Sequence, residues 1–140
     1  MLLIEIFDED QLLPGEPELY LDRLHAIAGE LDMKGTVVIK LGGKEESREL
    51  NHRYRQKDDA TDVLSFPFEE ELPEDGFYLG DIFICMPIAE EQAVENGIPL
   101  RDEVFTLMLH GLLHLAGHDH EQDDGSMMEL QEKLLKKYHS

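Results

Sequence analysis

The chain has 140 residues, the size of one ordinary domain, and its 41% hydrophobic content is enough to build a core. It carries 12 Lys and Arg against 32 Asp and Glu, which gives a formal net charge of -20. Such a charge repels polyanions at long range and argues against a general nucleic-acid coat protein, so any contact with RNA must be local. We expect one domain over residues 1–140.

The cysteine count and the hydropathy of the chain indicate the cellular compartment in which the protein belongs. Cys85 is the only cysteine, so no disulfide can form within the chain, which fits a reducing compartment. The first residues lack a basic region and turn acidic early, so we expect no signal peptide. No apolar run approaches the length needed to span a bilayer. The expectation is a cytoplasmic protein with no membrane partner.

The first half of the chain predicts strands and helices in alternation. In chain order these are a strand at 2–7, a helix at 18–31, a β-branched strand at 36–41 and a short helix at 44–55. The short helix should pack through Leu50 and Tyr54. A third strand should cover residues 62–66 and stop at Pro67, with the acidic stretch 69–75 forming a loop.

The second half predicts one more strand and three helices. These are a strand at 78–86, a helix that Pro87 begins and Gly97 ends, a helix at 101–116 and a last helix at 125–138. The run 82–85 is wholly apolar, which indicates a strand buried on both faces. The helix at 101–116 is apolar on all sides and should be central. We therefore expect an α+β domain: about four strands in a mixed sheet, about five helices, and a zincin-like central helix that carries metal ligands.

Half of the basic residues fall within one short segment, residues 40–57. They are Lys40, Lys44, Arg48, Arg53, Arg55 and Lys57. One interpretation is a solvated helix face, and composition alone favours it. The other is a confined positive surface that contacts RNA.

Three histidines have the spacing of a metal site. His110 and His114 lie four residues apart on the central helix, so both rings project from one face. Gly117 can end the helix in a left-handed conformation and return His120 to the same point. Three imidazoles with an open fourth position are typical of catalytic zinc, although iron, nickel and copper also accept imidazole.

Packing alone is the competing explanation for these histidines. A lone histidine in a core usually makes one hydrogen bond, but burying several imidazoles without partners is costly. The sequence therefore predicts one divalent ion per chain, preferably Zn²⁺, held by His110, His114 and His120. His118 should face solvent or the rim of the site, and Cys85 should belong to the core. The other histidines have no identifiable partner and are expected at the surface: His25, His52 and His139.

The spacing also matches the metzincin protease pattern H-E-x-x-H-x-x-G-x-x-H. One position departs from it, because Gly111 stands where the protease has its general base. Without that glutamate the usual activation of water for peptide cleavage is absent. This residue argues against a peptidase.

Three segments resemble one family in the same order along the chain. They are His-Gly-Leu-Leu-His-Leu-Ala-Gly-His-Asp-His at 110–120, Tyr-Arg-Gln-Lys-Asp at 54–58 with Thr-Asp-Val-Leu-Ser-Phe-Pro at 61–67, and Leu-Gly-Asp-Ile at 79–82. The chain resembles the YbeY family of bacterial metal-dependent endoribonucleases over most of residues 36–138. His118 departs from the family, which more often has tyrosine there, and this leaves the ligands untouched.

The resemblance implies zinc at the three histidines, an important arginine at Arg55, and a role in ribosomal RNA maturation in association with the ribosome. A guanidinium can stabilise the charge that builds on phosphate in a transition state, which suits a catalytic Arg55. A surface salt bridge is the alternative for this residue.

Three functions follow from these observations. The first, which we favour, is a single-strand-specific, metal-dependent endoribonuclease acting in ribosomal RNA maturation and ribosome quality control, with single-stranded RNA and the small ribosomal subunit as partners. The second is a metallohydrolase of another substrate class, peptide or small phosphoester. The third is a ribosome-associated binding protein whose metal is structural.

Overall fold

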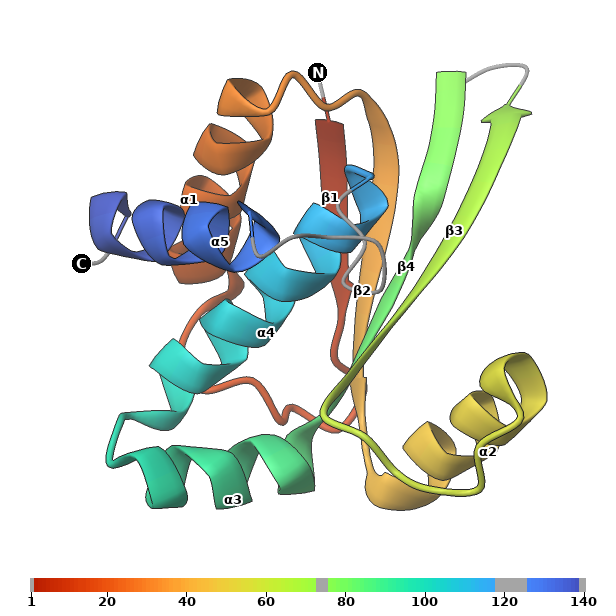
Figure 1. Ribbon diagram of the computed structural model, residues 1–140, viewed down its shortest axis with the longest axis vertical. Helices are drawn as coiled ribbons and strands as arrows, with labels where there is room; N and C mark the ends of the chain where they lie inside the picture. The colour runs from red at the N-terminus through yellow and green to blue at the C-terminus, as the bar shows by residue number, and fades with distance from the viewer. Residues whose placement is uncertain (1, 73–75, 118–125, 139–140) are drawn as a thin grey trace.

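The computed structural model describes residues 2–72, 76–117 and 126–138. In chain order the elements are β1 (Leu2–Phe7), α1 (Pro17–Glu30), β2 (Gly35–Gly42), α2 (Lys44–Arg55), β3 (Val63–Leu72), β4 (Gly76–Cys85), α3 (Met86–Asn96), α4 (Leu100–Leu115) and α5 (Ser126–Lys137). The predicted α+β architecture is confirmed (Figure 1). None of the helices in these three ranges is long and apolar enough to cross a membrane.

The four strands form one mixed sheet in the order β1-β2-β4-β3. β1, β2 and β4 run parallel, and β3 pairs with β4 in the antiparallel direction. The two outer positions therefore belong to β1 and β3. The two inner strands, β2 and β4, have neighbours on both sides.

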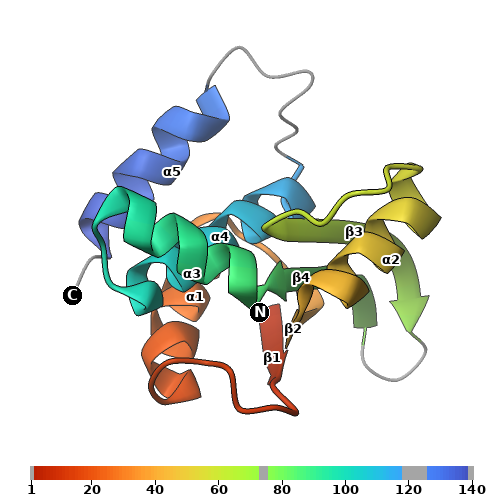
Figure 2. The same cartoon turned by 90° about the horizontal axis from the view of Figure 1, so that it is seen from below.

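Alternation along β4 divides the core into two layers. Ile82 and Ile84 point into the main core with residues of α1, α4 and α5, whereas Phe83 and Cys85 belong to a smaller cluster beneath Leu50 of α2. The prediction of a strand buried on both faces is confirmed. In Figure 2 α2 lies on the opposite side of the sheet from α1 and α4. We call the α2 side the outer face.

Helix α4 crosses the inner face of the sheet in close contact with β4. A Cβ atom at Gly111 would lie 2.8 Å from Cγ2 of Ile82, whose side chain is fully buried. The absence of a side chain at this position therefore lets the helix approach the sheet closely. The predicted central position of this helix is confirmed, because the side chains along its length are mostly buried.

The prediction that Pro67 stops its strand is wrong, because β3 continues to Leu72. Proline lacks an N–H, and sheets tolerate it only where no ladder hydrogen bond is needed. β3 is an edge strand, and its register shifts between Pro67 and Glu70. The acidic stretch that we expected to form a loop therefore begins as the second half of this strand.

Candidate functional site

The histidine pair on α4 has the geometry of two ligands to one ion. The Nε2 atoms of His110 and His114 lie 3.2 Å apart. Zinc–nitrogen bonds of about 2.0–2.1 Å in a tetrahedron separate two nitrogens by roughly 3.3 Å. The pair therefore fits a single metal ion without rearrangement of the helix.

A buried amide on α5 orients the first of these rings. Nδ1 of His110 donates to Oε1 of Gln131 at 2.9 Å, and Gln131 is only 6% exposed. Since an amide oxygen can only accept, the proton of His110 lies on Nδ1 and the lone pair on Nε2. Metal-binding histidines in proteins are commonly supported in this way.

Sequence reasoning missed Gln131, although a signal was present. Met127, Gln131 and Leu134 are the buried residues of α5, at the spacing of one helix face. A glutamine within an otherwise apolar face of a helix indicates a buried polar partner elsewhere. The pattern indicates that Gln131 has a buried hydrogen-bonding partner, but it does not identify that partner as His110.

The third predicted ligand, His120, lies outside the described residues, as does His118. Within the described ranges, no group of three or more His, Cys, Asp or Glu side chains gathers to hold a metal. The turn expected at Gly117 is present, since its φ is 101°. All three ligands therefore stay predictions, and the structure describes the positions of two of them, His110 and His114.

Arg55 is the last residue of α2 and reaches the edge strand. Its Nη2 donates to the carbonyl oxygen of Ser65 at 3.3 Å, while Gln56 ends the helix in a left-handed conformation. The loop that follows is tied to α2 by two buried side chains, because Ser47 binds Thr61 and Asn51 donates to the carbonyl of Asp59. Arg55 makes no salt bridge with any acidic residue whose side chain the structure describes, a set that leaves out Glu69, Glu70 and Glu71 of β3, so the salt-bridge alternative stays open.

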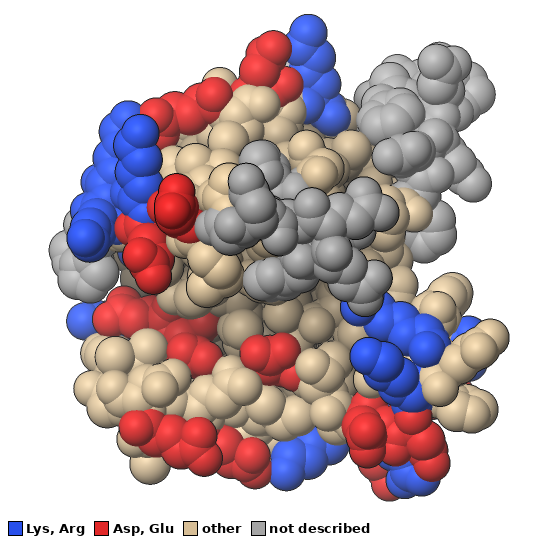
Figure 3. Space-filling view, viewed as in Figure 1, with Lys and Arg blue, Asp and Glu red and all other residues tan. Residues whose placement is uncertain are grey.

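Four of the six basic residues at 40–57 form ion pairs with acidic side chains. The ion pairs are Lys40–Glu46 at 2.6 Å, Lys44–Glu91 at 2.9 Å, Arg48–Asp58 at 2.7 Å and Arg53–Glu49 at 3.0 Å. Figure 3 shows acidic and basic side chains intermixed over α2, at the lower right. Among the residues whose side chains the structure describes, Arg55 and Lys57 are the members of the segment without an acidic partner. Within that set, the unpaired basic charge lies at the C-terminal end of α2.

At Gly80 of β4, the edge strand β3 comes close to the C-terminal end of α4. A Cβ atom at Gly80 would collide with the carbonyl oxygen of Phe66 and lie 2.8 Å from Cδ2 of Leu115. Phe66 follows the residue that anchors Arg55, and Leu115 follows His114 on α4. The strand whose Ser65 carbonyl accepts the Arg55 hydrogen bond and the helix that carries the histidine pair thus pack together, while α2 itself lies on the opposite face of the sheet.

The remaining expectations concern isolated residues. Cys85 is fully buried in the smaller core cluster as predicted, and burial raises the pKa of its thiol. His52 is exposed on α2 as expected. The surface expectation is wrong for His25, which is partly buried and whose Nε2 has no hydrogen-bond partner among the described residues. His139 lies outside the described residues.

Comparison with known proteins identifies the family. Residues 18–139 match the family model described as Endoribonuclease YbeY. The Koribacter versatilis protein of that name is 47% identical over 119 residues, covering 85% of this chain and 73% of its own. The Staphylococcus saprophyticus protein of that name is 37% identical and covers 99% of this chain and 97% of its own.

A solved structure shares the fold. The solution structure of TM1509 from Thermotoga maritima superposes with a TM-score of 0.67 at 32% identity, and the match covers 99% of this chain and 89% of that one. The family model, the relatives and this structure agree over nearly the whole chain. The chain belongs to the YbeY endoribonuclease family.

Proposed function

We propose that the protein is a single-strand-specific, metal-dependent endoribonuclease that hydrolyses phosphodiester bonds of ribosomal RNA during its maturation. The observation that carries the proposal is the histidine pair with its support. Two Nε2 atoms lie 3.2 Å apart, and the amide of Gln131 holds the ring of His110 with its lone pair toward His114. Membership of an endoribonuclease family gives this metal-binding geometry its substrate class.

The proposed ion is one Zn²⁺ per chain, held by His110, His114 and His120. When bound, zinc supplies a Lewis acid that polarises a phosphoryl oxygen and lowers the pKa of water to about 7. The chain's own part is to keep two imidazole lone pairs aimed at one point. The Gln131 amide does so for His110, because it fixes both the tautomer and the plane of the ring.

Arg55 is the proposed phosphate ligand. Its planar guanidinium matches phosphate geometry, and its hydrogen bond to the Ser65 carbonyl holds the side chain against the edge strand β3, which packs on α4. Since no acidic side chain that the structure describes pairs with Arg55, its charge is available to an anion, whereas the charges of Arg48 and Arg53 are already engaged by Asp58 and Glu49. In this position the side chain binds the reacting phosphate and stabilises the charge that develops on it.

The surroundings of Gly111 disfavour the peptidase alternative. The protease general base would occupy this position, yet a side chain there would meet Ile82. The residue that a metzincin uses to activate water is therefore absent here, and packing against Ile82 disfavours a side chain at this position. The net charge of -20 further fits a local contact with RNA and not a broad one.

Cleavage of defined substrates tests the proposal. The full chain, loaded with zinc, is incubated with a labelled unstructured RNA, the same RNA annealed to its complement, and an unstructured peptide. We expect the single strand to be cut, the duplex to be cut far more slowly and the peptide to stay intact. A chelator should abolish cleavage, and added zinc should restore it.

Two variants serve as a matched pair of histidine substitutions. His114→Ala should lose both bound zinc and RNA cleavage, whereas His52→Ala, at an exposed position on α2, should keep both. Cleavage by His114→Ala at the parent rate would overturn the role of the histidine pair. Cleavage of peptide with intact RNA would instead establish the second class of metallohydrolase.

Association with the small ribosomal subunit in the cytoplasm is part of the same proposal, and co-sedimentation with purified subunits tests it.

A further inference from the structure

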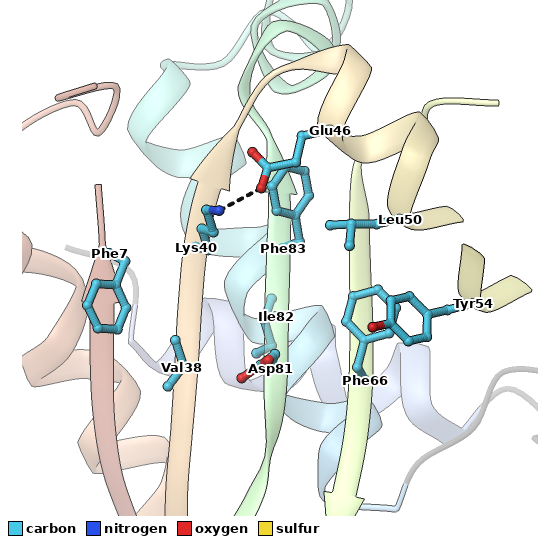
Figure 4. Close-up of a pocket in the computed structure, with 10 residues that line it drawn as sticks. All are labelled: Phe7, Val38, Lys40, Glu46, Leu50, Tyr54, Phe66, Asp81, Ile82 and Phe83. Carbon is cyan, nitrogen blue, oxygen red and sulfur yellow. Dashed lines mark hydrogen bonds and ion pairs between the residues drawn. The ribbon is translucent and has the colours of Figure 1, made fainter. Parts of the chain in front are cut away.

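A pocket separate from the histidine pair opens on the outer face of the sheet. It lies between the strands and α2, with a volume of about 190 Å³. Figure 4 shows the side chains around it, which come from all four strands and from α2. Its lining includes Phe7, Lys40, Tyr54, Phe66 and Asp81. No step of the proposed metal chemistry uses this space.

Aromatic rings form the sides of the pocket and are accessible from solvent. Tyr54 is 56% exposed, and its ring contacts that of Phe66 with centroids 5.0 Å apart and planes inclined by 54°. Phe7, on the other side, is 51% exposed. Exposed aromatic faces of this kind are the platforms on which unpaired bases stack, whatever their identity.

Polar groups complete the lining. Asp81 lies between the aromatic side chains and accepts a hydrogen bond from the hydroxyl of Tyr78. Nζ of Lys40 pairs with Glu46 at the upper end of the pocket in Figure 4. The pocket therefore offers apolar faces together with hydrogen-bonding groups at its floor and end. A nucleobase has the complementary form, since it combines two flat faces with a polar edge.

The position of Tyr54 connects this pocket to the proposed phosphate ligand. Tyr54 and Arg55 are consecutive residues in the last turn of α2, and they project in different directions because each helical residue turns by about 100°. Tyr54 contacts Phe66, while Arg55 contacts the carbonyl of Ser65, the residue just before it. A base in the pocket and a phosphate at Arg55 would thus be parts of one nucleotide or of two adjacent ones.

We propose that this pocket binds one unpaired nucleobase of the RNA, next to the phosphate that Arg55 contacts. The inference rests on the proposed function and adds the element that recognises a single strand. A base paired within a duplex is stacked on both faces and has its pairing edge occupied, so it cannot enter. Stacking of this type depends weakly on base identity, so the pocket selects strandedness more than sequence.

Photo-crosslinking tests the site without relying on cleavage. A short unstructured RNA that carries a single 5-iodouridine is bound to the zinc-loaded chain, irradiated, and the crosslinked peptides are identified by mass spectrometry. We expect crosslinks at Tyr54, Phe66 or Phe7. The same RNA annealed to its complement should give none at these residues, and crosslinking of the duplex to the pocket would overturn the proposal.

Affinity measurements on variants give a second readout. Tyr54→Leu should weaken binding of the single-stranded RNA about tenfold, the scale for losing one stacked base, while Tyr54→Phe keeps the ring and should bind as the parent does. Leu19→Ala is the surface control, because Leu19 on α1 is also 56% exposed. The slope of log affinity against log salt should stay unchanged in Tyr54→Leu, since no phosphate contact is lost. Arg55→Ala should instead make that slope shallower.

The outcomes separate this inference from the nuclease proposal. Cleavage of RNA with normal binding by Tyr54→Leu and crosslinks only elsewhere would overturn the base pocket and leave the nuclease. Crosslinks in the pocket with weakened binding by Tyr54→Leu, but no cleavage under any metal condition, would support the pocket and overturn the nuclease. A changed salt slope in Tyr54→Leu would overturn base stacking in favour of a phosphate contact.

Discussion

Oε1 of Gln131 lies 2.9 Å from Nδ1 of His110, so a buried amide on α5 fixes the ring of a histidine on α4. The contact joins the last two helices of the chain, through residues 21 positions apart, at the point where the metal is proposed to bind. It also makes the last helix part of the site, although that helix supplies none of the proposed ligands.

Replacement of this amide should weaken metal binding while the fold is retained. Gln131→Met keeps the size and flexibility of the side chain but cannot accept the hydrogen bond, so His110 loses its fixed tautomer. We expect a 10–100-fold loss of zinc affinity, the usual effect of removing such a partner. Competition with a chromogenic chelator measures the affinity, and circular dichroism checks the helix content. Gln92→Met is the matched control, because Gln92 on α3 bonds Asp62 instead of a histidine. Equal losses of affinity in the two variants would contradict a specific role for Gln131.

Arg55 should matter for cleavage and not for stability. It is exposed, and its one described hydrogen bond, to the Ser65 carbonyl, is long at 3.3 Å. Arg55→Ala should melt close to the parent and keep its zinc, yet cleave RNA about two orders of magnitude more slowly, the scale for losing one transition-state donor. Arg55→Lys should restore little, because an ammonium lacks the planar fork. Arg53→Ala, which breaks the exposed pair with Glu49, is the control and should cleave normally. A melting temperature far below the parent in Arg55→Ala would make the residue structural.

Gly111 should resist even the smallest substitution. Alanine within a helix normally gains about 0.5–1 kcal/mol over glycine, but a Cβ here would lie 2.8 Å from the fully buried Ile82. Overpacking of a core costs about 1–3 kcal/mol, so Gly111→Ala should lower the free energy of unfolding by roughly 1–2 kcal/mol. Urea denaturation measures this difference. Gly29→Ala in α1 is the control, since a Cβ there meets nothing within 4 Å, and that variant should be slightly more stable than the parent. A gain of stability in both variants would show that α4 can move away from the sheet at little cost.

Glu103 should make stability depend on pH. Burial, with a smaller contribution from the charge of Asp62, raises the pKa of its carboxyl above the ordinary value of 4.5. The folded state therefore binds this proton more tightly than the unfolded state does. The resulting stabilisation is complete below the ordinary pKa and is lost as the pH rises through the raised one.

Glu103→Gln removes the charge and should raise the urea midpoint at neutral pH, with the difference from the parent disappearing in acid below pH 4.5. Metal-free protein is used for both chains so that zinc release does not contribute. Glu90→Gln, at an exposed position on α3, is the control. A lower midpoint for Glu103→Gln at neutral pH would mean that the carboxylate is stabilised by a partner outside the described residues.

Much of the scaffold could be predicted because its signals are local. The β-branched and apolar runs predicted the four strands, and the segment 44–55 predicted α2 with the bounds observed. The four-residue spacing of His110 and His114 predicted a shared face, and their Nε2 atoms do converge. Each of these inferences relates residues within one or two turns or one strand, where backbone geometry decides the outcome.

The predictions failed where tertiary packing decides. The Gln131–His110 contact joins residues 21 apart, and the Lys44–Glu91 pair joins residues 47 apart, so neither follows from periodicity. The sequence predicted a basic surface over residues 40–57, but ion pairs engage four of its six basic side chains. The rule that proline ends a strand failed at Pro67 because β3 lies at the edge of the sheet, where a missing N–H is tolerated. The order of strands depends on the whole sheet and cannot be read from the residues around Pro67.

The proline in the edge strand also affects how copies of the chain meet. β3 extends from Val63 to Leu72 and is an outer strand of the sheet, and a long edge strand is a template on which a second chain can add its own strand. Pro67 offers no N–H to such a chain, and the register shift beside it bends the ladder on its other side. Continuous edge-to-edge pairing is therefore interrupted near the middle of the strand, which protects a concentrated solution of the folded protein from aggregation along this edge.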